Sequence, residues 1–126
     1  MIQTLKGHTR SVLSVAVTPD GKKAVSGSWD NALKVWDLES GREVQTLQGH
    51  TLSVNAVAVT PDGKRAVSGS DDNTLKVWDL ESGRIMIEFA GDGAITSIGL
   101  SPDGRIIIAG EASGRVHFLR LEKMQA

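Results

Sequence analysis

The sequence has no cysteine, an aromatic content of only 4% and no long apolar run. Without cysteine the chain can form no disulfide and offers no thiolate to a metal. No apolar stretch approaches the about 18 residues of a membrane-spanning helix, and the first residues lack the apolar core of a secretory signal. The 14 basic and 15 acidic residues nearly balance, whereas nucleic-acid-binding proteins usually carry a basic excess. These absences predict a cytoplasmic protein that binds neither membrane nor nucleic acid.

An internal repeat is the strongest positive feature of the sequence. Three short motifs recur: Gly-His at 7–8 and 49–50, Trp-Asp at 36–37 and 78–79, and Pro-Asp-Gly from 19, 61 and 102. The first two motifs recur after 42 residues, and residues 7–42 match 49–84 at 30 of 36 aligned positions. A third unit begins at Gly91 and has lost one residue before Ile95. Such a fixed period indicates a repeat architecture.

Each unit has the pattern of four short strands. In the first unit, apolar or alternating segments are separated by turn residues, and the predicted strands are 11–17, 23–28, 33–36 and 43–47. No segment has the periodicity of an amphipathic helix. Four antiparallel strands in about 40–45 residues are typical of a propeller blade, which predicts an all-β protein.

The Gly-His and Trp-Asp pairs at this period resemble the WD40-repeat β-propeller family, including bacterial multi-repeat members. The resemblance covers essentially the whole chain and implies three four-stranded blades, the last degenerate. The expected division is an outer strand of a neighbouring blade (1–6), two complete blades (7–48 and 49–90) and a degenerate third blade (91–126). It further implies a non-enzymatic scaffold for protein partners, with no cofactor and no metal.

The family's blades contain a hydrogen-bonded tetrad of His, Ser or Thr, Asp and Trp. By position, the resemblance assigns two structural tetrads: His8, Ser26, Asp30 and Trp36, then His50, Ser68, Asp72 and Trp78. A chain Trp→Ser→His→Asp lets every member use its donors and acceptors. In the third unit these positions hold Asp92, Ala109, Ser113 and Leu119, so we expect the network to be lost as a whole.

Serine, histidine and aspartate together also suggest a hydrolase triad. A triad is recognised by geometry, and a catalytic serine sits on an exposed, strained turn. Ser26 and Ser68 instead lie within predicted strands, and each has a Trp partner for its hydroxyl. We therefore expect a structural role. The third histidine, His117, is expected to be a strand-surface or core residue.

The resemblance places partner contacts at three positions per blade, two in the first strand and one before the tetrad Asp. The candidate partner-binding residues are Ser11, Leu13 and Trp29, then Ser53, Asn55 and Asp71, with Ala94, Thr96 and Ala112 in the third blade. Two of the six differences between the first two units fall here, Leu13/Asn55 and Trp29/Asp71. An exposed Trp is favoured at binding hot spots. Packing of Trp29 over its own turn is the alternative.

Three blades cannot close a ring, since propellers have four to eight. Residues 2–8 match 44–50 and are predicted to be a fourth strand, whereas 122–126 are too short and polar for one. Head-to-tail assembly into a dimer of six blades or a trimer of nine is therefore expected. A C-terminal fragment of a longer bacterial WD40 signalling protein is one alternative. A small-ligand or glycan-binding propeller is another, although few aromatics are available for stacking.

Overall fold

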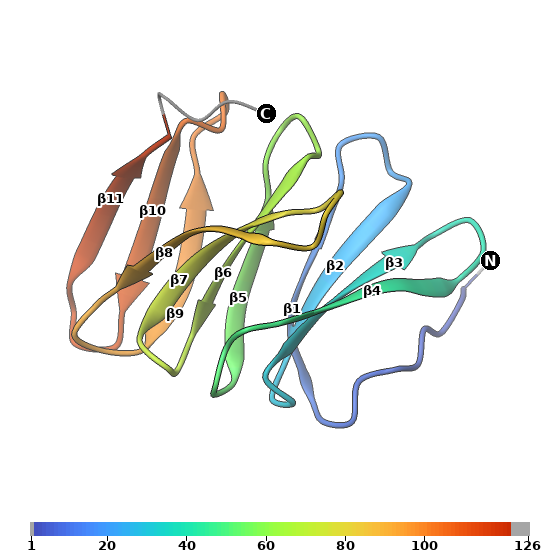
Figure 1. Ribbon diagram of the computed structural model, residues 1–126, viewed down its shortest axis with the longest axis horizontal. Coiled ribbons are helices and arrows are strands. Elements are labelled where there is room, and N and C mark those ends of the chain that lie inside the picture. The colour runs from blue at the N-terminus through green and yellow to red at the C-terminus, as the bar shows by residue number, and fades with distance from the viewer. Residues whose placement is uncertain (1, 122–126) are drawn as a thin grey trace.

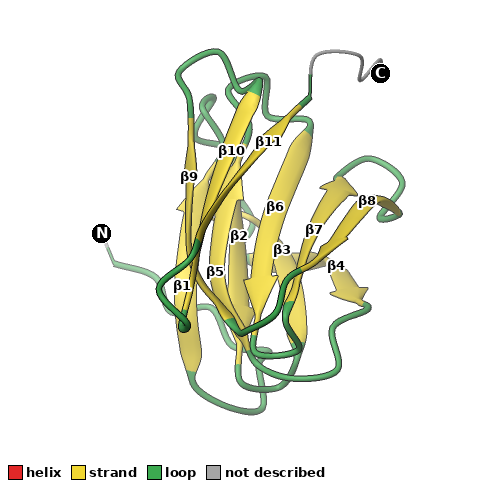
Figure 2. Ribbon diagram, turned by 90° about the vertical axis from the view of Figure 1, so that its left-hand side faces the viewer, coloured by secondary structure: helices red, strands yellow, loops and turns green. Residues whose placement is uncertain are grey.

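Within residues 2–121 the protein consists of eleven strands and the segments that join them. The computed structural model describes residues 2–121, and the polar segment 122–126 lies outside them. The strands are β1 (Val12–Val17), β2 (Lys23–Ser28), β3 (Ala32–Asp37), β4 (Arg42–Gln48), β5 (Val54–Val59), β6 (Arg65–Ser70), β7 (Thr74–Asp79), β8 (Ile85–Ala90), β9 (Ile95–Leu100), β10 (Ile106–Glu111) and β11 (Val116–Arg120). Figure 2 shows strands joined by loops, and no helix in this part of the chain could cross a membrane.

The strands form three antiparallel sheets, which we call blades 1, 2 and 3. Their strand orders are β1-β2-β3-β4, β5-β6-β7-β8 and β9-β10-β11, so each sheet is a simple meander. The first strands pack side by side, β1 against β5 and β5 against β9. The blades consequently fan out in chain order, from blade 1 at the right of Figure 1 to blade 3 at the left. The all-β propeller architecture expected from the repeat is confirmed.

Tight turns with left-handed residues join the strands of each blade. The Pro-Asp-Gly turns end in glycines with positive φ, for example 71° at Gly21. In the turns after β2 and β6, Asn31 and Asn73 adopt φ of 72° and 73°. Asparagine tolerates this region better than most residues, and Gly114 takes the equivalent place in blade 3.

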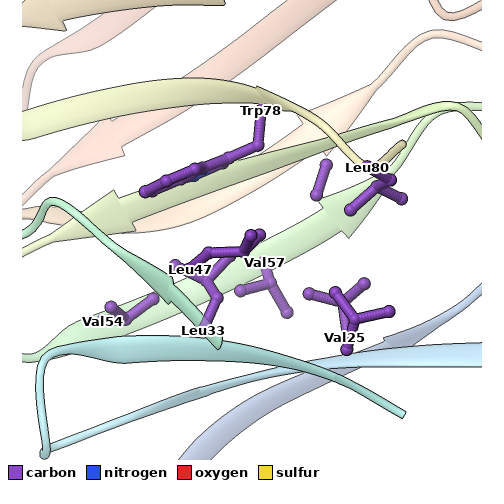
Figure 3. Packing of buried hydrophobic residues seen from close by; sticks show 9 residues of the cluster. Val25, Leu33, Leu47, Val54, Val57, Trp78 and Leu80 are labelled. Atoms are coloured by element: carbon purple, nitrogen blue, oxygen red, sulfur yellow. The ribbon is translucent and has the colours of Figure 1, made fainter. Parts of the chain in front are cut away.

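The core lies between the blades rather than inside one sheet. Val25, Leu33, Val35 and Leu47 of blade 1 pack against Val54, Val57, Ala66, Trp78 and Leu80 of blade 2 (Figure 3). A second cluster repeats this arrangement one blade further on, with Val67, Leu75 and Val77 against Ile95, Ile107, Ala109 and Leu121. Almost every member of the second cluster is the repeat equivalent of a member of the first. Each blade therefore offers two different apolar faces, one to each neighbour.

One sequence expectation differs from the structure. The sequence predicts an outer strand over residues 1–6, but no part of 2–8 is a strand in this structure. A strand requires a hydrogen-bonded partner, and in residues 2–121 none pairs with this segment. Blade 3 likewise contains three described strands, not four.

Close packing between blades makes some glycines irreplaceable. A Cβ added at Gly69 would lie 2.4 Å from Ile95 Cγ2 of the next blade, whereas a Cβ at Gly99 would meet nothing within 4 Å. We expect Gly69→Ala to lower the free energy of unfolding by about 1–3 kcal/mol through overpacking. The control Gly99→Ala should stay within about 0.5 kcal/mol. Urea denaturation of both variants measures the difference, and equal losses would contradict this account of the interface.

Candidate functional site

The tetrad side chains of blade 2 come together from four segments. His50 precedes β5, Ser68 lies on β6, Asp72 lies in the next turn and Trp78 lies on β7. Trp78 Nε1 donates to Ser68 Oγ at 2.8 Å, and Ser68 Oγ lies 2.6 Å from His50 Nε2. His50 Nδ1 lies 2.9 Å from Asp72 Oδ2. Because the indole can only donate, the serine hydrogen points to Nε2, and Nδ1–H donates to the carboxylate.

Blade 1 repeats this geometry. Trp36 Nε1 donates to Ser26 Oγ at 2.8 Å, and His8 lies 2.6 Å from Ser26 Oγ and 2.8 Å from Asp30 Oδ2. The Asp30 carboxylate also accepts backbone N–H bonds from Thr9 at 3.1 Å and from residue 32 at 3.0 Å. The tetrad thus fastens the segment before β1 to the turn after β2.

Burial and hydrogen bonding change the protonation of the blade 2 tetrad. Burial lowers the pKa of His50, and the bond to Asp72 only partly offsets this effect. Burial raises the pKa of Asp72, but hydrogen bonds from Thr74, His50 and Thr51 outweigh it and bring the pKa to about 2. The neutral imidazole and the ionised carboxylate are therefore the favoured pair, as the donor chain requires.

The tetrad serines lack the setting of a nucleophile. Ser68 is fully buried and Ser26 nearly so, both within β-strands. Each hydroxyl accepts from an indole and donates to a histidine, which occupies it on both sides. The constellation occurs once per complete blade, which fits a component of the fold.

Blade 3 replaces the tetrad with a different polar cluster around Glu111. The Glu111 carboxylate accepts from His117 Nε2, from Ser113 Oγ at 2.7 Å and from the backbone N–H of Asp92 at 3.4 Å. The hydrogen bond from His117, followed by that from Ser113, lowers the pKa of Glu111. The His117 ring also packs edge-on against Phe89, with centroids 4.9 Å apart.

Sequence reasoning missed this cluster. Alignment to the tetrad positions pointed to Asp92, Ala109, Ser113 and Leu119, and nothing in that alignment marks Glu111. The available signal was an acid and a histidine six residues apart on opposite sides of a turn, which places both on paired strands. His117 is half-buried, and its partner is this carboxylate.

The candidate partner-binding residues gather at one end of the blades. We call this end the top face; it carries the turns after β2, β6 and β10. The N–H groups of Trp29, Asp71 and Ala112 donate to the carbonyls of Ser11, Ser53 and Ala94 at 3.0, 3.0 and 2.9 Å, respectively. These three bonds place the same two positions side by side in every blade, including the degenerate one.

Leu13, Asn55 and Thr96 occupy β-bulges, where the pairing register skips one residue. A bulge leaves its residue outside the regular ladder and redirects its side chain. Asn55 Nδ2 donates to Asp71 Oδ1 at 2.7 Å and to the carbonyl of Ile95 in blade 3 at 3.1 Å. Thr96 Oγ1 donates to the carbonyl of Gly110 at 3.3 Å.

Blade 1 has apolar side chains where blade 2 has this polar pair. Leu13 and Trp29 are both exposed, and Trp29 retains 53% of its accessible surface. Because Asn55 touches Asp71, the equivalent positions 13 and 29 are neighbours as well. Their exposed side chains make Leu13 and Trp29 the most apolar pair among the candidate residues of the top face.

The fold and the repeated tetrads define a β-propeller segment of the kind that binds other proteins. The family described as "WD domain, G-beta repeat" matches residues 1–37, 41–79 and 83–118. The chain belongs to this WD40-repeat family. In residues 2–121 no three His, Cys, Asp or Glu side chains are grouped as a metal site would require.

Several curated proteins are similar to single repeats of this chain. The small ribosomal subunit protein RACK1 of Dictyostelium discoideum is 49% identical over 39 residues, 31% of this chain and 12% of that protein. The ribosome biogenesis protein WDR12 homolog of Drosophila persimilis is 53% identical over 38 residues, 30% of this chain and 9% of that protein. The vegetative incompatibility protein HET-E-1 of Podospora anserina is 56% identical over 39 residues, 31% of this chain and 3% of that protein. The matched segments are thus small parts of much longer proteins.

Loss of a tetrad member should destabilise the fold strongly. We expect Trp36→Ala or His8→Ala to lower the free energy of unfolding by roughly 2–4 kcal/mol, through a cavity and unpaired polar groups. His117→Ala should cost less, because Glu111 keeps its bonds to Ser113 and to the backbone. Chemical denaturation of the three variants tests the order, and a larger loss at His117 would contradict the role assigned to the tetrad.

The same network predicts a dependence of stability on pH. His50 has a lowered folded pKa, so its stabilising contribution is present above 6.5 and is lost as the pH falls below that value. Asp72 also has a lowered folded pKa, so its contribution is present above 3.8 and is lost as the pH falls towards about 2. Unfolding measured over this range should show both declines, and Asp72→Asn should make the lower one smaller, because other carboxyls such as Asp30 and Asp62 also have lowered pKa values. An unchanged profile in Asp72→Asn would show that this carboxylate is not the titrating group.

Proposed function

We propose that this chain is a protein-interaction scaffold whose blades assemble head-to-tail with further copies into a closed ring. One observation carries the proposal. The outward faces of blades 1 and 3 are the two complementary halves of the interface that occurs twice inside the chain. The WD40 family supports the scaffold role, and these two faces support the assembly.

The outward face of blade 1 carries the same side chains as the face of blade 2 that packs on blade 1. On blade 1, however, these side chains are exposed. Val12 and Val15 are the repeat equivalents of Val54 and Val57, which are buried against blade 1. Val15 keeps 66% of its surface exposed, whereas Val57 keeps 8%. The face is thus built to be covered by another blade.

The outward face of blade 3 is the other half of the same interface. Ile108, Val116 and Phe118 take the positions of Val67, Leu75 and Val77, which are fully buried between blades 2 and 3. Val116 and Phe118 keep 66% and 76% of their surfaces exposed. A terminal blade adapted to solvent would carry polar side chains at these positions.

Covering these faces has a large energetic value. Burying one Val, Leu or Phe side chain contributes about 1.5–3 kcal/mol, so these five exposed side chains represent on the order of 10 kcal/mol per junction. The two halves differ, so one copy's blade 3 must meet another copy's blade 1. Contacts of this kind form closed rings when the rotation per subunit closes.

The isolated 126-residue chain should therefore be a closed homo-oligomer. Light scattering should give two copies for a ring of six blades or three copies for a ring of nine. Removing residues 1–6 should weaken the assembly, and Phe118→Asp should do the same by placing a charge in the junction. A folded monomer at micromolar concentration would contradict the assembly and would favour blades supplied by a longer protein.

The same proposal places protein recognition at Leu13 and Trp29 on the top face. Their exposed apolar surface supports this role, because aromatic anchors dominate protein interfaces. Asn55 and Asp71 give blade 2 a different, polar surface at the same positions. Recognition would then differ from blade to blade while the strands remain the same.

Trp29→Ala should change the free energy of unfolding by less than about 1 kcal/mol, as expected for an exposed side chain. Trp78→Ala provides the matched control, because the same substitution in the tetrad should cost several times more. Denaturation measures both values, and affinity capture with quantitative mass spectrometry compares proteins retained by Trp29→Ala and by the parent chain. A large loss of stability at Trp29 would favour a packing role over recognition.

A further inference from the structure

The sequence contains four Asp-Gly dipeptides, at 20–21, 62–63, 92–93 and 103–104. In such a dipeptide the glycine nitrogen can attack the aspartate side chain, because glycine has no side chain of its own to hinder the approach. The attack requires that the nitrogen and the carboxyl carbon meet in a suitable geometry. The hydrogen bonds around each dipeptide therefore decide whether it reacts.

Three of the dipeptides lie in the Pro-Asp-Gly turns, where both reacting groups are held. In blade 1 the Gly21 N–H donates to the carbonyl of Thr18 at 2.9 Å. The Asp20 carboxylate accepts from Thr18 Oγ1 at 2.6 Å and from the Lys22 N–H at 2.9 Å. These two bonds, the hydroxyl first, lower the pKa of Asp20 and keep it as the less electrophilic carboxylate. The corresponding bonds are present in blades 2 and 3.

The dipeptide at 92–93 lies in the loop before β9 and is not held in this way. Within residues 2–121 the Gly93 N–H donates no hydrogen bond, and the one partner of the Asp92 carboxylate is Arg115. This ion pair is open to solvent, with 75% of the Asp92 side chain and 60% of the Arg115 side chain exposed. Exposed ion pairs hold their side chains weakly, so this carboxylate can turn towards the backbone.

The change of polar network in blade 3 explains the unbonded N–H. In blades 1 and 2 the residue after the tetrad histidine is Thr9 or Thr51, and its N–H donates to the tetrad aspartate at 3.1 or 3.0 Å. Gly93 holds the corresponding place in blade 3, but Ser113 stands where that aspartate would be. The Ser113 hydroxyl donates to Glu111 at 2.7 Å, and no carboxylate replaces the tetrad acceptor at that position.

We propose that Asp92-Gly93 is a site at which the folded chain isomerises to isoaspartate. The Gly93 nitrogen attacks Asp92 Cγ, a C–N bond forms, and the carboxyl OH leaves with the amide hydrogen as water. Water then adds to the resulting succinimide. Cleavage at the side-chain carbonyl restores aspartate, whereas cleavage at the main-chain carbonyl routes the chain through Cγ and leaves a free α-carboxylate. The reaction has no net change in mass or redox state, and it does not depend on the proposed assembly.

The loop around this dipeptide is too closely fitted to accept the altered backbone. An isoaspartyl linkage adds one methylene to the main chain. The Gly91 N–H donates to the carbonyl of Asn73 at 2.8 Å, and the Asp92 N–H donates to Glu111 at 3.4 Å. A Cβ at Gly91 or Gly93 would already lie 2.6 or 3.1 Å from an oxygen of Glu111. Since packed structures do not absorb a methylene without a shift, isomerisation should detach the loop from Glu111 and loosen the top of blade 3.

Prolonged incubation of the folded chain at neutral pH tests the site. The probe is an isoaspartate carboxyl methyltransferase with labelled S-adenosylmethionine, which transfers a methyl group to the free α-carboxylate. The parent chain should gain label steadily, and Asp92→Glu should gain several-fold less, because glutamate would have to close a larger ring. Asp103→Glu is the matched control and should label like the parent. In urea all four dipeptides should become labelled, because the turns no longer hold them.

Equal labelling of folded parent and folded Asp92→Glu would overturn the proposal, as would a parent chain that is labelled only in urea. Fragmentation of the tryptic peptide 85–105, which contains both 92–93 and 103–104, locates the isoaspartate in the parent itself and needs no variant. Isoaspartate found at 103–104 before 92–93 would overturn the proposal as well.

The effect on the loop has its own measurement. After the same incubation, the modified fraction of the parent should unfold at a lower urea concentration than incubated Asp92→Glu. An unchanged midpoint in chains shown to carry isoaspartate at residue 92 would overturn the predicted loosening of blade 3 while leaving the modification site in place.

Discussion

Burial of apolar side chains between the faces of neighbouring blades is the constraint on which the rest of this structure depends. A four-stranded sheet alone has too little interior to be stable, and here the apolar side chains meet only between sheets. The contact surface is directional, because β2 and β3 of one blade supply the side chains that enter a receptor made by the next. Gly27 and Gly69 allow this approach, since a Cβ at either position would collide with Val54 or Ile95 of the neighbour. The two outward faces of such a repeat therefore differ from each other, and they correspond to the two sides of the interface between blades.

The tetrad serves this packing by holding the top loop in place. It connects the segment before the first strand to the turn after the second, so the valines that follow enter the interface at a fixed position. Blade 3 meets the same need with a carboxylate. Gly91 and Gly93 bring the loop close to Glu111, where a Cβ would lie 2.6 and 3.1 Å from its oxygens. The central polar group of blade 3 is thus the carboxylate of Glu111, at the repeat position of Ser70, whereas that of blade 2 is the hydroxyl of Ser68, whose equivalent in blade 3 is Ala109.

Most of the fold can be predicted from the sequence, because the pattern of strand and turn residues recurs in each repeat. The strand positions and the all-β architecture follow from alternation and turn residues in 7–48 alone. The sequence does not reveal the Glu111–His117 pair, because alignment of blade 3 to the tetrad draws attention to other positions. Glu111 and His117 stand where blade 2 has Ser70 and Lys76, which are not tetrad members. The bulges at Leu13, Asn55 and Thr96 leave no trace in composition. Residues 2–6 repeat the sequence of a strand, yet strand formation needs a partner that repetition alone cannot supply.

The bulges also place variable side chains outside the regular strand ladder of this fold. A side chain at a bulge lies outside the regular ladder, so it can change without the loss of a ladder hydrogen bond. Asn55 also reaches the next blade, through its hydrogen bond to the carbonyl of Ile95. Blade 1 has Leu13 beside Trp29 at these positions, and blade 2 has Asn55 bonded to Asp71. The surrounding strands, tetrads and turns are nearly identical in the two blades. Two of the six differences between these blades fall at this pair of top-face positions, and the Trp29 side chain keeps 53% of its surface exposed there.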